Sequence, residues 1–169
     1  IVLKNEQPEN IVEEMLSLWK KLDGHMLPVE KRKILFVGEE ISFASRYRVE
    51  HFREQLILRG YASRFIQMDQ AEKESLEEYE AIVLYRCSKL MEVEMLADRA
   101  KAAGIRVYYD IDDLVFDYEK IAGLHFLKGK EYSDFRTTAE RTHGCMEFCD
   151  GYITSTETLA GVLREEFSG

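Results

Sequence analysis

The sequence predicts an α/β protein built on a doubly wound, mostly parallel sheet with helices on both faces. Two observations lead to this fold class. Short runs of consecutive apolar residues, at 34–37 and 81–85, are typical of strands that are buried on both faces. Segments with the apolar spacing of helices lie between such runs, so each strand is joined to the next by a helical crossover.

Residues 1–30 are predicted to form an amphipathic helix and a linker ahead of the main domain, which spans residues 31–169. Apolar side chains recur along residues 9–22 at the spacing of one helix face. They are Ile11, Val12, Met15, Leu16, Trp19 and Leu22. Asp23 and Gly24 then end the helix, because they form a turn sequence.

The first half of the main domain is predicted to contain two strands, each followed by a helix. Residues 34–37 follow three basic residues and form a buried strand. Residues 47–59 have a helical pattern, and Gly60 ends this helix. Residues 63–67 form the second strand, and residues 71–79 form a short acidic helix.

The middle of the domain repeats the alternation. Residues 81–85 are apolar throughout and form the third strand. Residues 89–103 form a helix that Gly104 closes, and residues 105–109 form the fourth strand. We expect this helix to face the core through Met91, Met95, Leu96 and Ala100.

The last part contains a helix at residues 133–149, a fifth strand at 152–154 and a final helix at 157–166. In an open parallel sheet, ligands bind beyond the carboxyl ends of the strands. The residues that directly follow each strand are therefore the places to search for function.

Composition excludes several classes of protein. The 23 basic and 32 acidic residues give a net charge of −9, which argues against nucleic acid as a partner. No apolar run approaches the ~20 residues that span a bilayer, and the start of the chain lacks a signal-peptide pattern. The three cysteines, an odd number without an export signal, fit reduced thiols. We therefore expect a cytoplasmic protein.

Gly38 and Glu39 follow the first strand, and Ser45, Arg46 and Arg48 stand at the start of the next helix. A helix N-terminus presents free backbone N–H groups, and the two arginines add positive charge beside them. The segment suits an anionic or polyhydroxylated ligand, although a solvated loop is the alternative. A dinucleotide is not expected, because three spaced glycines are missing here.

Arg86 follows the third strand, so we expect it at the same edge of the sheet, where it either binds a ligand or pairs with a carboxylate. Cys87 has no histidine nearby in the sequence and is interpreted as a small buried residue. His143, Cys145 and Cys149 lack the spacing and the fourth ligand of a zinc site. We interpret these three residues as structural.

The fourth strand leads into the most unusual segment, where Asp110, Asp112 and Asp113 occupy three of four positions. Carboxylates this close raise one another's pKa unless a cation, an arginine or backbone donors compensate them. Such clusters occur more often for function than for packing. A helix N-cap would explain one aspartate but not three.

Three interpretations of this aspartate cluster compete. The carboxylates could chelate a divalent metal. One could be a phosphotransfer nucleophile, since the segment resembles the first motif of haloacid-dehalogenase-type phosphatases, which usually have Thr or Val in place of Leu114. They could instead accept hydrogen bonds from sugar hydroxyls, from backbone N–H groups, or from Arg46, Arg48 or Arg86. We favour this third interpretation.

Several segments also follow one another in an order that resembles a known family. They are Gly38-Glu39, Ser45-Arg46-Tyr47-Arg48, Leu58-Arg59-Gly60-Tyr61, Tyr109-Asp110-Ile111-Asp112-Asp113-Leu114 and the stretch 149–160. Together they resemble the N-terminal, acceptor-side Rossmann-like domain of GT-B-fold glycosyltransferases of the group 1 type. The segment that contains the aspartates is similar to bacterial members that build surface polysaccharides. The resemblance covers residues 33–167.

The resemblance implies that this domain holds a polysaccharide or glycolipid acceptor, while a C-terminal domain beyond this chain holds the nucleotide sugar. We therefore interpret the chain as a fragment that is inactive alone. No cofactor or metal is expected. Peripheral association of the full-length enzyme with a membrane is compatible with this interpretation. The catalytic candidates are Asp110, Asp112 and Asp113, and the substrate-binding candidates are Gly38, Glu39, Ser45, Arg46, Arg48 and Arg86.

The alternative is a non-catalytic ligand-binding or receiver-like module of similar topology. A receiver places an acidic pair after the first strand, which Glu39 and Glu40 could supply. It also needs a phosphorylatable aspartate after the third strand, where Arg86 and Cys87 stand. That difference disfavours the receiver.

Overall fold

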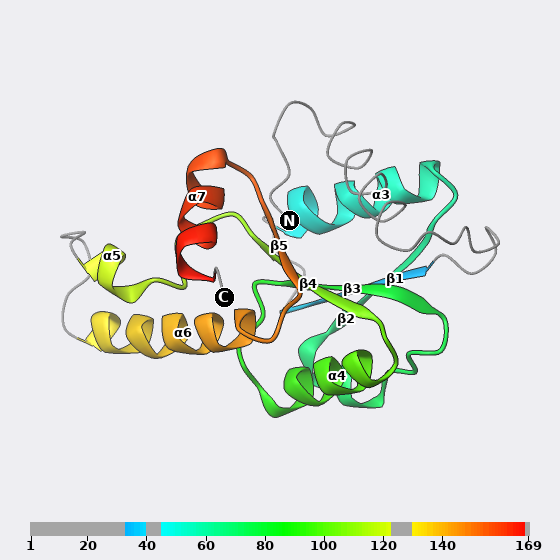
Figure 1. Cartoon of the computed structure of the whole chain (residues 1–169), viewed down its shortest axis with the longest axis horizontal. Coiled ribbons are helices and arrows are strands. Elements are labelled where there is room, and N and C mark those ends of the chain that lie inside the picture. The colour runs from blue at the N-terminus through cyan, green and yellow to red at the C-terminus, as the bar shows by residue number, and fades with distance from the viewer. Residues whose placement is uncertain (1–32, 40–44, 123–129, 168–169) are drawn as a thin grey trace.

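The computed structural model describes residues 33–39, 45–122 and 130–167 (Figure 1). The helix and linker predicted for residues 1–30 lie outside these residues. Within them, no helix is long and apolar enough to cross a membrane.

Five parallel strands form one sheet in the order β2-β1-β3-β4-β5. Their bounds are Lys33–Gly38 for β1, Ala62–Gln67 for β2, Tyr79–Tyr85 for β3, Arg106–Ile111 for β4 and Gly151–Thr154 for β5. All five predicted strands are thus present. The parallel sheet with helices on both faces confirms the predicted Rossmann-like α/β fold.

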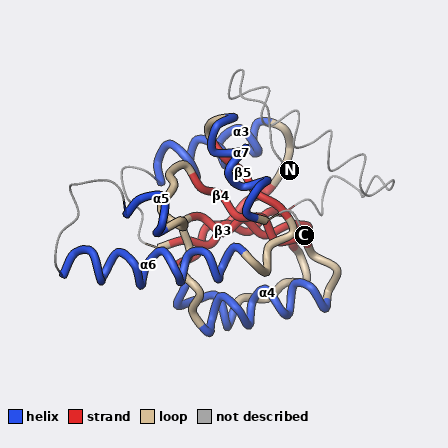
Figure 2. Tube along the Cα trace, turned by 60° about the vertical axis from the view of Figure 1, so that its left-hand side comes forward, coloured by secondary structure: helices blue, strands red, loops and turns tan. Residues whose placement is uncertain are grey.

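Helical segments surround the strands, as Figure 2 shows. They are the π-helical turn η2 (Arg46–Glu50), α3 (His51–Leu58), the 3₁₀ helix η3 (Met68–Lys73), α4 (Met91–Ala102), α5 (Tyr118–Ala122), α6 (Lys130–Met146) and α7 (Glu157–Glu166). The turn η2 runs directly into α3, so the two together form the helix predicted at residues 47–59.

The two faces of the sheet bury separate apolar clusters, because side chains alternate between faces along each strand. One face packs against η2 and α3, whose contribution includes Val49 and Leu56. The opposite face packs against α4, α6 and α7, with Leu96, Met146 and Leu163 among its members. Figure 1 shows α3 and α4 on opposite sides of the strands.

Helix α4 buries only some of the residues that were predicted to face the core. Leu96 and Ala100 are fully buried as predicted. Met91 and Met95 are 67% and 38% exposed, so their predicted inward orientation is wrong. The helix begins at Met91 rather than at residue 89, and Val93 and Ala97 supply the inner positions instead. These residues complete a stripe at the i, i+3, i+4, i+7 spacing.

The helix predicted at residues 71–79 is also wrong in place and type. The 3₁₀ helix η3 starts earlier, because Gln67 and Gln70 form a capping box. It ends early because the Arg99 guanidinium donates to the backbone carbonyls of Glu72 and Glu74, which a longer helix would use itself. Tyr79 already belongs to β3.

Strand β4 extends two residues beyond its predicted end, to Ile111. The extension pairs with β5, where Asp110 lies opposite Ile153 and Ile111 opposite Thr154. Asp110 is therefore part of the sheet, while Asp112 and Asp113 follow it in the loop. Helix α5 was not predicted; the Asp117 carboxylate accepts a hydrogen bond from the backbone N–H of Lys120 near its start, at 2.9 Å.

Candidate functional site

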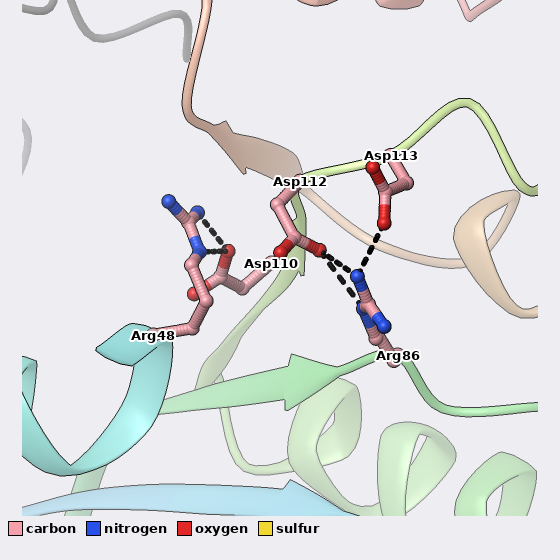
Figure 3. Close-up of polar contacts among 5 residues, drawn as sticks. All are labelled: Arg48, Arg86, Asp110, Asp112 and Asp113. Carbon is pink, nitrogen blue, oxygen red and sulfur yellow. Dashed lines mark hydrogen bonds and ion pairs between the residues drawn. The ribbon is translucent and has the colours of Figure 1, made fainter. Parts of the chain in front are cut away.

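The carboxyl ends of neighbouring strands gather the predicted site residues at one edge of the sheet. In register, Gly38 of β1 lies opposite Tyr85 of β3, and Tyr85 lies opposite Asp110 of β4. Figure 3 shows Arg86 at the tip of β3, facing the aspartates that end and follow β4. Arg48 reaches the same group from η2 (Figure 3).

The first pair in this group joins Arg48 to Asp110. Asp110 is 4% exposed, and its Oδ1 accepts hydrogen bonds from Nε of Arg48, at 3.2 Å, and from Nη2. The π-helical turn that carries Arg48 is closed by a bond from the His51 N–H to the Arg46 carbonyl. Such wide turns are frequent at functional sites.

Burial and charge act against each other in this pair. Burial raises the pKa of the Asp110 carboxyl, and the Arg48 guanidinium opposes that rise. Burial alone would lower the pKa of Arg48, but the Asp110 carboxylate outweighs it and the pKa is raised. A buried charge without its partner is strongly destabilising, so each side chain fixes the other in place.

The second pair links the tip of β3 to the loop after β4. Nε and Nη2 of Arg86 donate to Oδ1 of Asp112 at 2.8 and 2.6 Å, and Nη2 also donates to Oδ2 of Asp113 at 2.5 Å. The side chains of Arg86 and Asp113 are 34% and 61% exposed. This group therefore faces solvent, unlike the pair of Arg48 and Asp110.

Arg86 adopts an unusual backbone conformation, with φ of +49°. Left-handed φ values are uncommon for residues other than glycine and cost on the order of 1 kcal/mol or more. The turn redirects the chain at the tip of β3, and the Arg86 N–H donates to the Asp110 carbonyl at 3.3 Å. Strain of this kind often accompanies functional sites.

The segment after β1 holds three further candidate residues, Gly38, Glu39 and Ser45. A Cβ on Gly38 would stand 3.1 Å from the Phe65 ring and 3.3 Å from the Tyr85 carbonyl, so glycine allows close packing there. Glu39 is exposed, and Ser45 is buried at the start of η2. Gly38 is the last residue of β1, Glu39 directly follows it, and Ser45 directly precedes η2.

Arg46 does not join the aspartates. Its side chain is 58% exposed, and its Nη2 lies 3.4 Å from a carboxylate oxygen of Glu54 on α3. Of the three arginines proposed to organise the cluster, the structure brings Arg48 and Arg86 to it and directs Arg46 to Glu54.

Sequence reasoning missed Tyr85, the last residue of β3. Tyr85 is 4% exposed, and within the described part of the chain its hydroxyl is buried without a hydrogen-bond partner. Burial raises its pKa to about 12, and the nearby charges of Arg86, Asp112, Asp110 and Arg48 also act on it. Its position directly before Arg86, at a strand's carboxyl end, was the signal that could have found it.

Cys87 lies in the interior of the protein. Cys87 is fully buried, as predicted, and its Sγ lies 3.3 Å from the Val37 carbonyl oxygen. Burial raises the pKa of the Cys87 thiol well above its usual value, which keeps it protonated. Across the described ranges, no three or more His, Cys, Asp or Glu side chains are grouped to hold a metal ion.

A separate open pocket of about 310 Å³ lies beside α5, α6 and α7. Phe116, Tyr118, Arg136 and His143 line it together with four carboxylates. Two of these groups already pair with each other, since Nε of Arg136 donates to Glu140 at 2.8 Å. None of the lining residues belongs to the group of aspartates and arginines at the sheet edge.

No protein-family model matches this chain, and no curated protein matches it either.

Proposed function

We propose that this chain is the acceptor-binding half of a glycosyltransferase, which moves a sugar from a nucleotide sugar to a polysaccharide or glycolipid acceptor. A second domain, C-terminal to the chain, would hold the nucleotide sugar. The observation that carries the proposal is the group of three aspartates and two arginines at the carboxyl edge of the sheet. Ligands of open parallel sheets bind at this edge.

The hydrogen-bonding capacity of this group suits a ligand with hydroxyl groups. The arginines engage one oxygen of each aspartate: Oδ1 of Asp110, Oδ1 of Asp112 and Oδ2 of Asp113. The second carboxylate oxygens of Asp112, whose side chain is 24% exposed, and of the exposed Asp113 can accept hydrogen bonds from a ligand. Hydrogen bonds from sugar hydroxyls to ionised carboxylates are among the stronger neutral-to-charged contacts.

The charge of the group favours a neutral ligand over a phosphate. Three carboxylates face two guanidinium groups, and each guanidinium is already bound by at least one carboxylate. A phosphoryl group would meet an excess of negative charge here. The first aspartate, which a phosphotransfer enzyme would use as its nucleophile, is Asp110, and it is buried and bound by Arg48.

The transfer assay uses the chain extended by whatever follows residue 169 in its reading frame, with a panel of nucleotide sugars and glycoside acceptors. Asp112→Asn keeps the side-chain shape but removes the charge. We expect kcat/KM for the acceptor to fall about ten- to a hundredfold, the loss of one charged hydrogen bond. The KM for the nucleotide sugar should stay unchanged, because that ligand lies on the other domain.

Asp98→Asn is the matched control. Asp98 is an exposed residue of α4, which covers the face of the sheet that lies away from η2 and Arg48. It should leave both parameters unchanged. Unaltered acceptor kinetics in Asp112→Asn would remove Asp112 from the site. No transfer from any nucleotide sugar would refute the glycosyltransferase itself.

A further inference from the structure

We propose that the hydroxyl group of Tyr85 is an acceptor-binding group that hydrogen-bonds a hydroxyl of the acceptor sugar. This inference rests on the proposed function, because it identifies a further residue of the same site. Neither of the two arginine–aspartate pairs involves the hydroxyl group of Tyr85. Within the described residues, the Tyr85 hydroxyl is buried and has no hydrogen-bond partner.

Buried polar groups in folded proteins almost always have partners, so an exception needs an explanation. The tyrosine at the other end of β3 shows the usual arrangement: the Tyr79 hydroxyl donates to a carboxylate oxygen of Glu74 at 2.7 Å. Tyr79 and Tyr85 are buried to a similar degree, at 6% and 4% exposed. Of these two tyrosines, the one without a hydrogen-bond partner among the described residues lies at the carboxyl end of the strand, where ligands bind.

The position of Tyr85 places its side chain with the charged group. Tyr85 lies opposite Asp110 in the register of β3 and β4, and paired residues of neighbouring strands point to the same face. The guanidinium carbon of Arg86 lies 5.7 Å from the centre of the Tyr85 ring. The charges of Arg86, Asp112, Asp110 and Arg48 also act on the pKa of the Tyr85 hydroxyl.

The chemistry of the hydroxyl fits a sugar. Burial raises the pKa of Tyr85 to about 12, so the group stays protonated near neutral pH and can both donate and accept. A sugar hydroxyl also does both. A ring that donates one hydroxyl to the second oxygen of Asp112 can pair a neighbouring hydroxyl with Tyr85. The Arg86 guanidinium, on a side chain that is 34% exposed, lies over the tyrosine ring at the surface side of the site.

The experiment measures binding of methyl glycosides of glucose, galactose, mannose and rhamnose to this chain by saturation-transfer NMR. It compares the unaltered chain with Tyr85→Phe and Tyr79→Phe. The two variants lose the same atom from opposite ends of one strand. In Tyr85→Phe, we expect binding to weaken about fivefold or more, with no loss of thermal stability, because no protein hydrogen bond is removed. In Tyr79→Phe, we expect lower thermal stability and unchanged binding.

The other outcomes separate this inference from the proposed function. Equal binding by the unaltered chain and Tyr85→Phe would overturn the role of Tyr85 and leave the proposed function standing; the hydroxyl would then serve a bound water molecule only. Equal weakening in both variants would overturn it as well, because the loss would not be specific to the site. Failure of the unaltered chain to bind any glycoside would count against the proposed function itself.

Discussion

Arg48 and Arg86 both bind aspartates, but their surroundings give them different roles. The side chains of Arg48 and Asp110 are 19% and 6% exposed, so this pair lies inside the protein and positions η2 against β4. Arg86 and Asp113 lie at the surface, where a ligand can compete for their hydrogen bonds. We therefore assign structural positioning to the first pair and propose ligand contact for the second.

Replacing Arg48 tests the buried pair. Arg48→Met leaves Asp110 without its counter-ion, and we expect a loss of about 3 kcal/mol in the free energy of unfolding near neutral pH. The pKa of Asp110, already raised by burial, should rise further. The folded variant then holds a proton that the unfolded chain has released, so its stability should recover as the pH falls toward about 5. Urea denaturation at both pH values measures this.

Arg46→Met is the control, because Arg46 lies in the same turn but is exposed and pairs with Glu54. It should change stability by no more than about 0.5 kcal/mol at either pH. An Arg48→Met penalty that does not change with pH would show that Asp110 is not the group whose charge the arginine compensates.

At the residue scale, the sequence predicted the aspartates better than their partners. Three carboxylates at a strand end are visible in the sequence because they are electrostatically unusual. The choice of Arg48 over Arg46 depends on the direction of a π-helical turn, which spacing does not reveal. Tyr85 looked like one more apolar strand residue, since its missing partner appears only when the surrounding groups are placed.

At the scale of elements, strand β3 ends at a backbone turn that glycine would adopt more easily than arginine. We predict that Arg86→Ala is less stable than Arg86→Gly by about 1 kcal/mol, because alanine retains the strain at φ of +49° and glycine relieves it. Both variants lose the same guanidinium contacts, so their difference reports the backbone alone.

Urea denaturation of the two variants gives this difference directly. The sign of this stability difference is informative, because in regular structure a glycine variant is ordinarily less stable than the corresponding alanine variant. An Arg86→Gly variant that is less stable than Arg86→Ala would contradict a left-handed conformation at the tip of β3.

The elements with a clear sequence pattern lie close to their predicted places, and those whose ends depend on distant residues do not. The five strands lie at the predicted apolar runs, with β4 ending two residues later, and helix α7 follows the Thr156 cap, which accepts from the Leu159 N–H. The segment at 71–79 departs because Arg99, from α4, ends η3. Short helix α5 depends on a single aspartate cap and has too few residues for a periodic pattern.

At the scale of the whole molecule, the sheet order makes the site. Strand β3 lies between β1 and β4, so residues 48, 86 and 110 meet although 62 positions separate the first and the last. The predicted parallel topology already required the carboxyl ends to share an edge. Which side chains pair there, and which ones lie in the interior, depended on packing that no single segment of the sequence contains.

We propose that Asp112 and Asp113, whose side chains are 24% and 61% exposed, bind a sugar at this edge of the sheet. A crystal structure of the chain soaked with the best-bound methyl glycoside tests it most directly. We predict sugar hydroxyls within about 3.2 Å of the carboxylates of Asp112 or Asp113. A glycoside bound instead in the pocket beside His143 and Arg136, with the aspartates untouched, would contradict the claim.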